Sequence, residues 1–565
     1  MAADGPYDVI VIGGGPAGST AACYLAMKGY AVILFERETF PRYRLGESLL
    51  PSTTPVLEDL GVLDAMEAAG FPRKTGGSFT WGADETPWSV RFSENPFLPS
   101  SYGYHVERSV FDKILLDRAI ELGTDVMQPC RVKEVLVEEG RVVGVSYIDR
   151  DTEEVREVRA RFTIDGSGPA SVVGRKMTTR TYDDRMRQTS LFTYYKDVAG
   201  EPEGQEGHVV VTTGPMGWFW YIPMNSDELG EASVGLVTGQ EFRPQIKEMG
   251  AERFFEAALA ATPKVQAMLG PNAKRVGGYR AIQDWAFVCG QLAGPGYFLA
   301  GDAAAFIDPL LSTGVTLAML AAYSASVCIH TIMNDGDLEQ QAIDFYDGNY
   351  KQMYSVTRDC LLYFYSGNLI GHDDVFWQAR RLMKFGDNAG AKQAFSFLVN
   401  TVAANPHPAA ARQIHMFHQF MDNLEHPIEE MADEPEFTAL QEANSPRPAN
   451  IDDLTDATLL KVNGHIEDTC VINAEEHLLE PVRGIAYDAE RPVFSSTASW
   501  LLGRNFASMD ADALALLELV DGERDWRTIL DTYAAEHACT PGEASEALEP
   551  SLHRLTKEAF LLWAE

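Results

Sequence analysis

The chain has 565 residues, 45% of them hydrophobic, and a formal net charge of −36 at pH 7. This length allows two or three buried cores, and the acidic balance argues against binding to nucleic acid or to an anionic membrane. Seven scattered cysteines without a CxxC spacing predict neither a metal site nor a disulfide framework, and they favour a reducing cytoplasm. The first apolar run, 9–12, is too short for a secretory signal, and no uninterrupted apolar run is long enough to cross a bilayer.

The first predicted elements form a strand–turn–helix–strand unit. A buried strand over 7–12 leads into a glycine-rich turn and a helix to residue 28, and a second strand over 31–35 ends at an acidic residue. The turn has the GxGxxG spacing, in which glycines admit a pyrophosphate and the acidic residue holds a ribose hydroxyl. This unit predicts a Rossmann-type domain for FAD or NAD, with a merely structural turn as the alternative. The expected binding residues are Gly13, Gly15, Ala17, Gly18 and Glu36.

A polar loop follows at 40–51, with two arginines, a Gly-Glu-Ser turn and a closing proline. Such a loop can line one side of a bound ring system, although loop charges are usually only solvated. Beyond a predicted helix over 53–60, Lys74 lies in a glycine-containing loop, where a lysine is ordinarily solvated as well. Its neighbour Arg73 is a poor nucleophile because an arginine is not deprotonated in proteins.

The next elements alternate between helix and strand. Apolar residues at helical spacing predict a helix over 108–119 that begins with Arg108. The other expected elements are strands over 126–128 and 162–164 and an acidic hairpin at 138–141. The last strand leads into Asp165 and Gly166, a second small-residue turn suited to approach the adenine half of a dinucleotide.

Residues 190–240 are predicted to form an antiparallel sheet, with strands such as 209–213 and 233–238. The same region contains the sequence WFWYIP. Alternation places Trp218 and Trp220 on one face of a strand that stops at Pro223. An aromatic ladder in the core is the structural interpretation of this pattern.

A further small-residue turn follows an apolar run at 297–299. Gly301 lets the backbone approach a ligand, and the carboxylate of Asp302 can accept hydrogen bonds from ligand hydroxyls. An apolar helix is predicted over 316–328, and Ser312, Thr313 and Gly314 stand at its start. Unpaired N–H groups at a helix N-terminus favour an anion. The stretch therefore predicts a cofactor with an anion beside it, with a plain capped turn as the alternative.

The composition changes after residue 370. Helices are predicted over 376–385 and 391–403, and proline and acidic residues at 427–448 indicate a linker. Residues 450–565 are predicted to form a separate, mainly helical module with helices over 510–522, 527–534 and 544–555. Its LLxLVDG run resembles small winged-helix peptide-binding modules. Because this module is acidic, we expect it to dock a substrate or act as a lid, and not to bind DNA.

Taken together, these motifs resemble the flavin-dependent halogenases over roughly residues 6–370. WxWxIP at 218–223 and FxxPxxSxG at 306–314 are similar to two signature motifs of that family. The resemblance implies an α/β fold, with a glutathione-reductase-like FAD domain and an antiparallel substrate sheet at about 180–285. The predicted organisation is a core over 1–370, a helical extension and linker over 371–449, and the C-terminal module.

The resemblance also implies roles for individual residues. Lys74, ahead of Trp81 and Gly82, matches the halogenase lysine at the far end of a tunnel from the flavin. Trp218 and Trp220 match the indoles that deny the substrate access to the flavin. The halide is expected beside Ser312, Thr313 and Gly314. The expected FAD contacts outside the first turn are Arg37, Arg44, Ser48, Arg108, Asp165, Asp284, Gly301, Asp302 and Pro309. Asp284 corresponds to a carboxylate that some relatives link covalently to FAD, although a polar turn residue is the structural interpretation.

The implied reaction uses FADH2, O2 and chloride or bromide. A separate NAD(P)H-dependent flavin reductase is expected, because no second dinucleotide pattern is evident in the chain. The flavin hydroperoxide oxidises the halide, and hypohalous acid reaches Lys74, which captures it as a haloamine or holds it by a hydrogen bond. Leu311 stands where free-tryptophan halogenases carry glutamate. The resemblance is therefore to the phenol and pyrrole branch of antibiotic biosynthesis, several members of which act on carrier-tethered substrates.

Two other functions are consistent with part of the pattern. An FAD-dependent aromatic monooxygenase would share the glycine-rich turn, Asp165 and Asp302, but it has no need of both signature motifs. A non-catalytic flavoprotein scaffold would have no need of Lys74. Halide dependence of turnover separates the leading interpretation from both.

Overall fold

The computed structural model describes residues 7–366 apart from three short gaps, together with shorter segments beyond them. The gaps are 83–84, 96–97 and 150–151, and the later segments are 368, 375–378, 460–462, 466–473, 477–485, 506–507, 511–521, 523–557 and 561–563. The chain divides into two compact units, Met1–Gln413 and Ile414–Glu565. Every motif expected to bind the cofactor or halide lies in the first unit.

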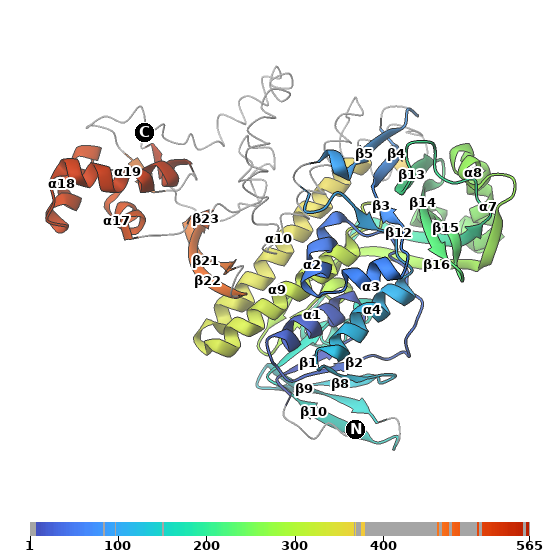
Figure 1. Ribbon diagram of the computed structural model, residues 1–565, viewed down its shortest axis with the longest axis horizontal. Coiled ribbons are helices and arrows are strands. Elements are labelled where there is room, and N and C mark those ends of the chain that lie inside the picture. The colour runs from blue at the N-terminus through green and yellow to red at the C-terminus, as the bar shows by residue number, and fades with distance from the viewer. Residues whose placement is uncertain are drawn as a thin grey trace. The chain divides into compact units, whose positions relative to one another are not determined.

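The first unit contains a six-stranded sheet. Its strands lie in the order β17 (Ala293–Gly294), β18 (Tyr297–Leu299), β11 (Phe162–Asp165), β1 (Val9–Ile12), β2 (Val32–Phe35) and β7 (Asp125–Met127). Figure 1 labels β1 and β2 of this sheet. All neighbouring pairs are parallel except β17 and β18. β1 and β2 are apolar and buried throughout, as parallel strands covered on both faces are. The predicted Rossmann-type fold is confirmed.

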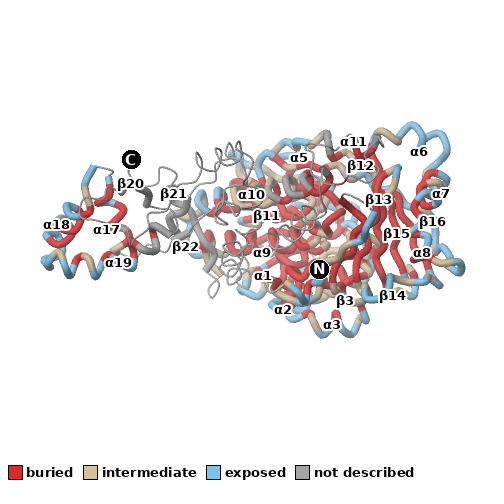
Figure 2. The backbone as a smooth tube through the Cα atoms, turned by 90° about the horizontal axis from the view of Figure 1, so that it is seen from above, coloured by how far each residue is buried: buried red, intermediate tan, exposed pale blue. Residues whose placement is uncertain are grey.

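Long helices cover this sheet. α1 (Pro16–Met27) follows β1 and packs against α4 (Arg108–Glu121) and α9 (Gly314–Asn334), and α10 (Glu339–Ser366) packs along α9. α9 is long and apolar enough to cross a membrane, with a mean hydropathy of 1.6, so the prediction that no apolar run has this length was wrong. However, 89% of its apolar window is buried inside the protein, as in a core helix, and Figure 2 shows it as a mostly buried tube.

Shorter elements connect these layers. β8 (Val132–Glu138) and β9 (Arg141–Ile148) form the predicted hairpin, and β10 (Val155–Arg159) completes a three-stranded sheet. The other elements are α2 (Thr54–Asp59), α3 (Leu63–Ala68), β3 (Arg73–Lys74), β6 (Gly103–Tyr104), α5 (Gly174–Met177) and α11 (Val375–Gln378). β3 pairs with β6, so Lys74 lies in a short strand and not in the predicted loop. Except for α11, the elements and linker predicted between 376 and 448 lie outside the described residues.

An eight-stranded sheet forms the second layer of this unit. Its order is β19 (Ala305–Phe306), β16 (Lys274–Cys289), β12 (Arg180–Lys196), β15 (Gly230–Gly239), β14 (Gly217–Ser226), β13 (His208–Gly214), β4 (Gly76–Thr80) and β5 (Trp88–Arg91). The neighbours are antiparallel except β13 and β4, which run parallel. The expected antiparallel sheet at 180–285 therefore also takes in two strands from residues 76–91.

The two faces of β14 have different surroundings. Phe219 and Tyr221 belong to an apolar cluster with α7 (Ala251–Ala260) and α8 (Pro263–Leu269), which follow α6 (Arg243–Met249). By alternation, Trp218 and Trp220 face away from these helices, as predicted. The strand does not stop at Pro223, which pairs with Ala232; a register shift follows, and β14 continues to Ser226. A bulge at this point lets the strand accommodate a residue without an N–H group.

The second unit combines helices with strands. α17 (Ala511–Leu519), α18 (Trp526–Glu536) and α19 (Pro541–Lys557) share a buried core that includes Leu516, Ile529 and Leu548. These helices match the three predicted helices to within a few residues. The described strands are β20 (Leu460–Val462), β21 (Ile466–Asn473), β22 (Leu478–Ile485), β23 (Phe506–Ala507) and β24 (Leu561–Trp563). None of these strands is expected from the sequence, so the module is less purely helical than predicted.

Candidate functional site

The glycine-rich turn joins β1 to α1 at a close contact of three backbone segments. Gly13 has a φ of +100°, and a Cβ built on it would lie 2.4 Å from the Gly166 carbonyl oxygen. A Cβ on Gly18 would lie 1.8 Å from the Gly13 carbonyl oxygen. Both positions therefore require glycine because no side chain fits. At Gly15, by contrast, the nearest group to a built Cβ is the Arg42 guanidinium at 3.3 Å, so this position faces a cation.

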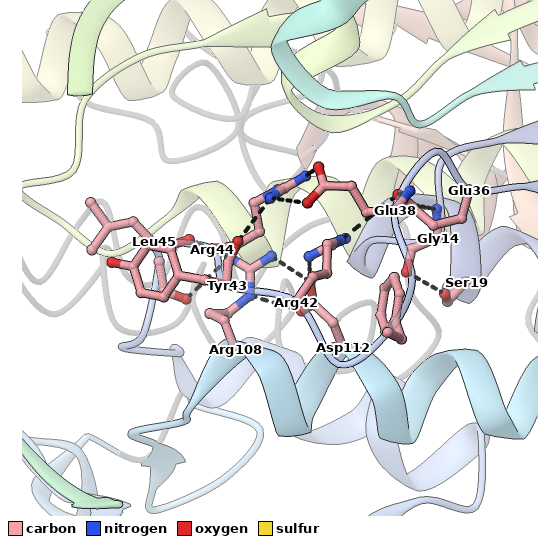
Figure 3. A network of polar contacts seen from close by, with 12 residues as sticks. Gly14, Ser19, Glu36, Glu38, Arg42, Tyr43, Arg44, Leu45, Arg108 and Asp112 are labelled. Carbon is pink, nitrogen blue, oxygen red and sulfur yellow. Dashed lines mark hydrogen bonds and ion pairs between the residues drawn. The ribbon is translucent and has the colours of Figure 1, made fainter. Parts of the chain in front are cut away.

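Glu36 lies at the end of β2, where the sequence pattern places the ribose-binding acid. It is buried, and its two carboxylate oxygens accept hydrogen bonds from the backbone N–H groups of Gly14 and Glu38, both at 2.8 Å (Figure 3). The Ser19 hydroxyl donates to the Gly14 carbonyl at 3.0 Å. Each carboxylate oxygen keeps a second lone pair for a ligand hydroxyl. The turn and the acid are thus fixed to one another before any ligand binds.

The three arginines at 37, 42 and 44 differ in burial and in their partners. Arg37 and Arg44, the two expected FAD contacts, both pair with Glu38 near the surface. Arg42 is the buried one: it donates to Asp112 at 2.8 Å (Figure 3). Its Nε lies 4.0 Å from Glu36 and has no hydrogen-bond partner among the described residues. A buried cation at the N-terminus of α1 suits a pyrophosphate. The local sequence does not distinguish Arg42 from Arg44, because the two arginines differ in their burial in the folded protein.

Arg108 begins α4 and is also buried. It donates to Asp112 from Nε at 2.8 Å and from Nη2 at 3.0 Å, and its Nη1 donates to the Leu45 carbonyl at 2.5 Å (Figure 3). It therefore fixes the loop over 40–51 to the helix. Ser48, in that loop, is buried, and its hydroxyl has no hydrogen-bond partner among the described residues. An orphaned hydroxyl of this kind fits a polar ligand edge.

The turn after β18 borders a small pocket. The pocket is lined by Gly301, Asp302, Ala305, Phe306, Ile307, Asp308, Thr313, Gly314, Leu317, Tyr350 and Tyr354. Gly301 has a φ of +60° and packs closely on Ala318 of α9. Burial raises the pKa of Asp302 to about 6, and Arg108 and Arg180 oppose this shift. Both members of the predicted Gly-Asp pair thus line the pocket.

The other two expected carboxylate contacts have different settings. Asp165 is buried, and its oxygens accept hydrogen bonds from Ser167, Val173 and Gly174, so it organises its own turn. Asp284 lies within β16, paired with Gln188 of β12, and not in the turn expected as its structural alternative. Asp165 therefore supports the turn beside Gly13, and Asp284 stands on a sheet.

The expected halide residues lie at the N-terminus of α9. Ser312 has a φ of +58°, its N–H donates to the Pro309 carbonyl at 3.2 Å, and Thr313 is the N-cap residue of a 21-residue helix. No side chain caps this terminus. Thr313 and Gly314 line the pocket, and a Cβ built on Gly314 would meet nothing within 4 Å. The first N–H groups of α9 are therefore available to an anion in the pocket.

Trp218 and Trp220 form a wall of the eight-stranded sheet. Both are buried, with ring centroids 6.2 Å apart. The Trp220 indole N–H donates to the Ser233 hydroxyl at 3.3 Å, and the Trp218 indole N–H donates to the Tyr365 hydroxyl at 2.8 Å. Phe192 and Trp81 pack against the ends of this pair. The two indoles are therefore held in place by polar contacts as well as by packing.

Lys74 is buried, with 1% of its surface exposed, which contradicts the solvated interpretation. Its ammonium nitrogen lies 5.8 Å from the centre of the Phe92 ring, and the described residues give it no ion pair or hydrogen bond. Burial lowers its pKa from 10.5 to about 7. Lys74 stands just before β4, which lies two strands from β14 across β13. A buried amine that is substantially neutral at pH 7 is a nucleophile.

One buried acid near the loop was not singled out from the sequence. Glu47 accepts a hydrogen bond from the Tyr194 hydroxyl at 2.5 Å, and that hydroxyl contacts the Tyr43 hydroxyl at 2.7 Å. Burial raises the pKa of Glu47 to about 7. The side chain links the loop over 40–51 to β12, so it lies between the dinucleotide turn and the large sheet. The Gly-Glu-Ser sequence of the loop was the available signal for Glu47, but it does not predict that this side chain is buried.

Comparison with known proteins decides the family. A model of the tryptophan halogenase family matches residues 8–99 and 93–405. The chain belongs to this family. It is a flavin-dependent halogenase, an oxidoreductase that uses FAD, a halide and O2. Its glycine cradle, the buried cation of Arg42 and the orphaned hydroxyl of Ser48 fit FAD.

Relatives of this halogenase match about two thirds of the chain. A tryptophan 2-halogenase of Chondromyces crocatus is 34% identical over 377 residues, which cover 66% of this chain and 70% of the relative. A 1H-pyrrole-2-carbonyl-[peptidyl-carrier protein] chlorinase of Pseudomonas fluorescens is 29% identical over 391 residues, covering 65% and 85%. The predicted membership of the halogenase family is confirmed.

Two solved structures are similar to the halogenase as well. The myxobacterial chondrochloren halogenase CndH is 35% identical with a TM-score of 0.64, covering 70% of this chain and 89% of that one. The flavin-dependent halogenase CmlS is 26% identical with a TM-score of 0.70, covering 99% and 96%. The likeness to CmlS therefore extends over the second unit.

Proposed function

We propose that this halogenase chlorinates an electron-rich aromatic ring, a phenol or a pyrrole, in the biosynthesis of a secondary metabolite, and that Lys74 delivers the halogen. The observation that carries the proposal is the state of Lys74. Burying an amine without a partner costs free energy, and the described residues around Lys74 provide no carboxylate to offset that cost. Such a residue is better explained by reactivity than by stability.

The residues of this chain divide the work between two places. Bound FADH2 and O2 supply the oxidised halogen, as hypohalous acid. In our proposal the glycine-rich turn, Glu36 and Arg42 hold the dinucleotide, and the N-terminus of α9 holds the halide beside Asp302. Trp218 and Trp220 exclude the aromatic substrate from the flavin side, because their rings fill one face of the sheet.

Two reactions at Lys74 are consistent with its pKa of about 7. In the first, the neutral amine attacks the halogen of hypohalous acid, water leaves, and an N-halo-lysine then passes the halogen to the ring. In the second, the ammonium form donates a hydrogen bond to the oxygen of hypohalous acid and makes its halogen more electrophilic. In both reactions the ring loses a proton and becomes a halo-arene. They differ in the protonation state of Lys74 that reacts.

The substrate class rests on one residue and on the names of relatives. Leu311 is buried and apolar at the position of the glutamate expected in free-tryptophan halogenases. A phenol or pyrrole activates its own ring and has less need of a carboxylate. Two relatives are named as a chlorinase and a brominase of 1H-pyrrole-2-carbonyl-[peptidyl-carrier protein]. These names support a substrate tethered to an acyl or peptidyl carrier protein. In our proposal a separate NAD(P)H-dependent reductase supplies FADH2, because the sequence shows no second dinucleotide pattern.

The test is an assay with purified enzyme, FAD, a flavin reductase, NADH, O2 and chloride or bromide. Free and carrier-bound phenols and pyrroles are compared, with the products identified by mass. We expect a halogenated arene whose yield depends on halide. Hydroxylated product without halide dependence would instead establish the aromatic monooxygenase.

The Lys74→Ala variant tests the proposed role of that residue. We expect it to bind FAD and to reoxidise FADH2 as the wild type does. We expect its halogenation rate to fall by at least about 100-fold, because removing a catalytic nucleophile from an enzyme has effects of at least this size. Lys274→Ala is the matched control, since Lys274 is exposed and pairs only with Asp197 among the contacts described. Near wild-type product formation by Lys74→Ala would refute the role of Lys74.

A further inference from the structure

The hydroxyl of Tyr365 joins the tryptophan wall to the halide turn. Tyr365 lies near the end of α10 and is buried. Its oxygen accepts a hydrogen bond from the Trp218 indole at 2.8 Å and lies 3.1 Å from the Asp308 carboxylate. The Gln188 side-chain amide also contacts it, from the nitrogen at 3.2 Å and from the oxygen at 3.3 Å. Four segments of the chain, including β12, β14 and α10, therefore meet at one hydroxyl group.

The hydrogen-bonding capacity of this hydroxyl matches its neighbours. A tyrosine hydroxyl donates once and accepts twice. The indole can only donate, and the carboxylate can only accept when ionised, so the proton of Tyr365 is directed to Asp308. Trp218 and the Gln188 amide nitrogen can then occupy its two acceptor positions. The Trp218 indole of β14 thus donates to the Tyr365 hydroxyl, and that hydroxyl donates to the Asp308 carboxylate of the turn.

Asp308 connects this chain of hydrogen bonds to the halide residues. Its other carboxylate oxygen accepts from the Leu310 N–H at 2.8 Å, which shapes the turn two residues before Ser312. Asp308 also lines the pocket together with Thr313 and Gly314. The Asp308 carboxylate therefore links the turn to the Tyr365 hydroxyl. The ring of Tyr365 is itself held by Trp81, at a centroid distance of 5.5 Å, and by Trp377 at 6.2 Å.

We infer that Tyr365 is a positioning residue that couples the halide turn to the tryptophan wall. It holds the indole of Trp218 in one orientation relative to the turn, so that oxidised halogen is retained on its way to Lys74. The inference rests on the proposed function for its catalytic consequence. The coupling itself rests on the hydrogen bonds from Trp218 to Tyr365 and from Tyr365 to Asp308.

The first test is Tyr365→Phe, which removes the hydroxyl and keeps the ring. We expect FADH2 reoxidation to stay within about twofold of the wild type, and halogenated product per FADH2 consumed to fall about fivefold, an effect of the size of one buried hydrogen bond. Hypohalous acid that escapes is trapped in solution with taurine, and the N-halotaurine yield should rise in step. A merely structural role would lower the melting temperature and leave the product per bound flavin unchanged, and that result would overturn the inference.

Tyr346→Phe is the matched control. Tyr346 lies in the same helix, is equally buried, and loses one hydrogen bond, from its hydroxyl to the Leu299 carbonyl at 2.6 Å. This hydroxyl makes no described contact with Trp218. We expect Tyr346→Phe to change stability without changing the N-halotaurine yield. If the N-halotaurine yield rose equally in both variants, loss of any buried hydrogen bond of α10 would be enough to release hypohalous acid. That result would refute a specific role of Tyr365.

The second test measures coupling without turnover. The ¹⁵N indole signal of Trp218, identified by its absence in Trp218→Phe, is followed during bromide titration of the oxidised enzyme with FAD bound. We expect the signal to move in the wild type and to be insensitive to bromide in Tyr365→Phe. No movement in the wild type, or equal movement in both, would overturn the inference even if the enzyme halogenates. Movement confined to the wild type would support it even if no halogenated product were found.

Discussion

Burial is the cause of the low pKa of Lys74, which falls from 10.5 to about 7 without a contribution from a charged group. This makes the pH dependence informative. The haloamine reaction needs the neutral amine, so product per FADH2 consumed should rise as pH increases through about 7. The hydrogen-bonded reaction needs the ammonium form, so the same ratio should fall through about 7. We expect the rise, because a buried ammonium without a partner is disfavoured.

The measurement is product yield in single turnovers between about pH 6 and pH 8.5, divided by the FADH2 reoxidised at each pH. Among the residues that the structure describes, Glu47 is the other group whose pKa burial shifts to about 7. The Glu47→Gln variant therefore shows whether the profile belongs to Lys74: an unchanged midpoint assigns it to the lysine. A flat profile in the wild type would contradict the titration of Lys74 in this range.

At the scale of single residues, the sequence indicates which side chains are candidates for binding or catalysis, but it does not indicate how deeply each is buried or which residues it contacts. Spacing singled out Glu36 and motif matching singled out Lys74 as candidates, since each belongs to a local pattern. The burial of Arg42 could not be predicted from sequence, because Arg37, Arg42 and Arg44 lie within one polar stretch and only the fold buries Arg42. The Tyr365 hydroxyl was missed for a related reason: its partners, Trp218 and Asp308, are 147 and 57 residues away along the chain.

At the scale of elements, the contact between β1, α1 and β11 leaves no room for a side chain. Gly18→Ala would place a Cβ 1.8 Å from the Gly13 carbonyl oxygen. We expect the variant to lose stability by roughly 3 kcal/mol, as overpacked sites do, and to lose FAD affinity because α1 must shift. Chemical denaturation and flavin absorbance measure the two effects.

Gly278→Ala is the control for that substitution. Gly278 lies in β16, and a Cβ built there would meet nothing within 4 Å. We expect a change within about 0.5 kcal/mol, as at ordinary surface positions. If Gly18→Ala changed the free energy of unfolding as little as Gly278→Ala, the tight packing of the turn would not explain the glycine at position 18.

Asp284 provides a second test at this scale, because its backbone pairs with Gln188 of β12 and does not lie in a turn. The family resemblance predicts a covalent bond between Asp284 and FAD. Acid denaturation of the enzyme should then leave yellow colour on the polypeptide, and Asp284→Asn should release it all. Release of all FAD from the wild type would exclude the linkage.

Elements with a strong local pattern were predicted well, whereas pairings between distant segments were not. The strand, turn and helix at the start of the chain follow from glycine spacing and apolar runs. The parallel pairing of β13 with β4 joins residues about 130 apart, and no local pattern specifies it. β14 passes through Pro223 because a register shift follows the proline, a compensation that depends on the partner strand β15.

At the scale of the whole molecule, chemistry and recognition can be separated. The residues proposed to bind FAD, halide and the halogen acceptor all lie before residue 320, and Trp377 of α11 still packs on the same unit through a hydrogen bond to the Gly214 carbonyl at 3.1 Å. The helices α17, α18 and α19 have a core of their own. A truncated chain must therefore keep α11, and one that ends at Gln413 preserves the first compact unit.

We expect the chain that ends at Gln413 to be yellow and to reoxidise FADH2, because every proposed cofactor contact is retained. If residues 450–565 present the carrier or its cargo, this chain should lose halogenation of the tethered substrate by at least about tenfold, a loss of about 1.4 kcal/mol in recognition. It should still consume NADH with its reductase and divert reduced flavin to peroxide. Insoluble protein would indicate that the second unit covers an apolar face of the first. A soluble chain with an unchanged Michaelis constant for the tethered substrate would refute both roles, because neither docking nor cover would then depend on the second unit.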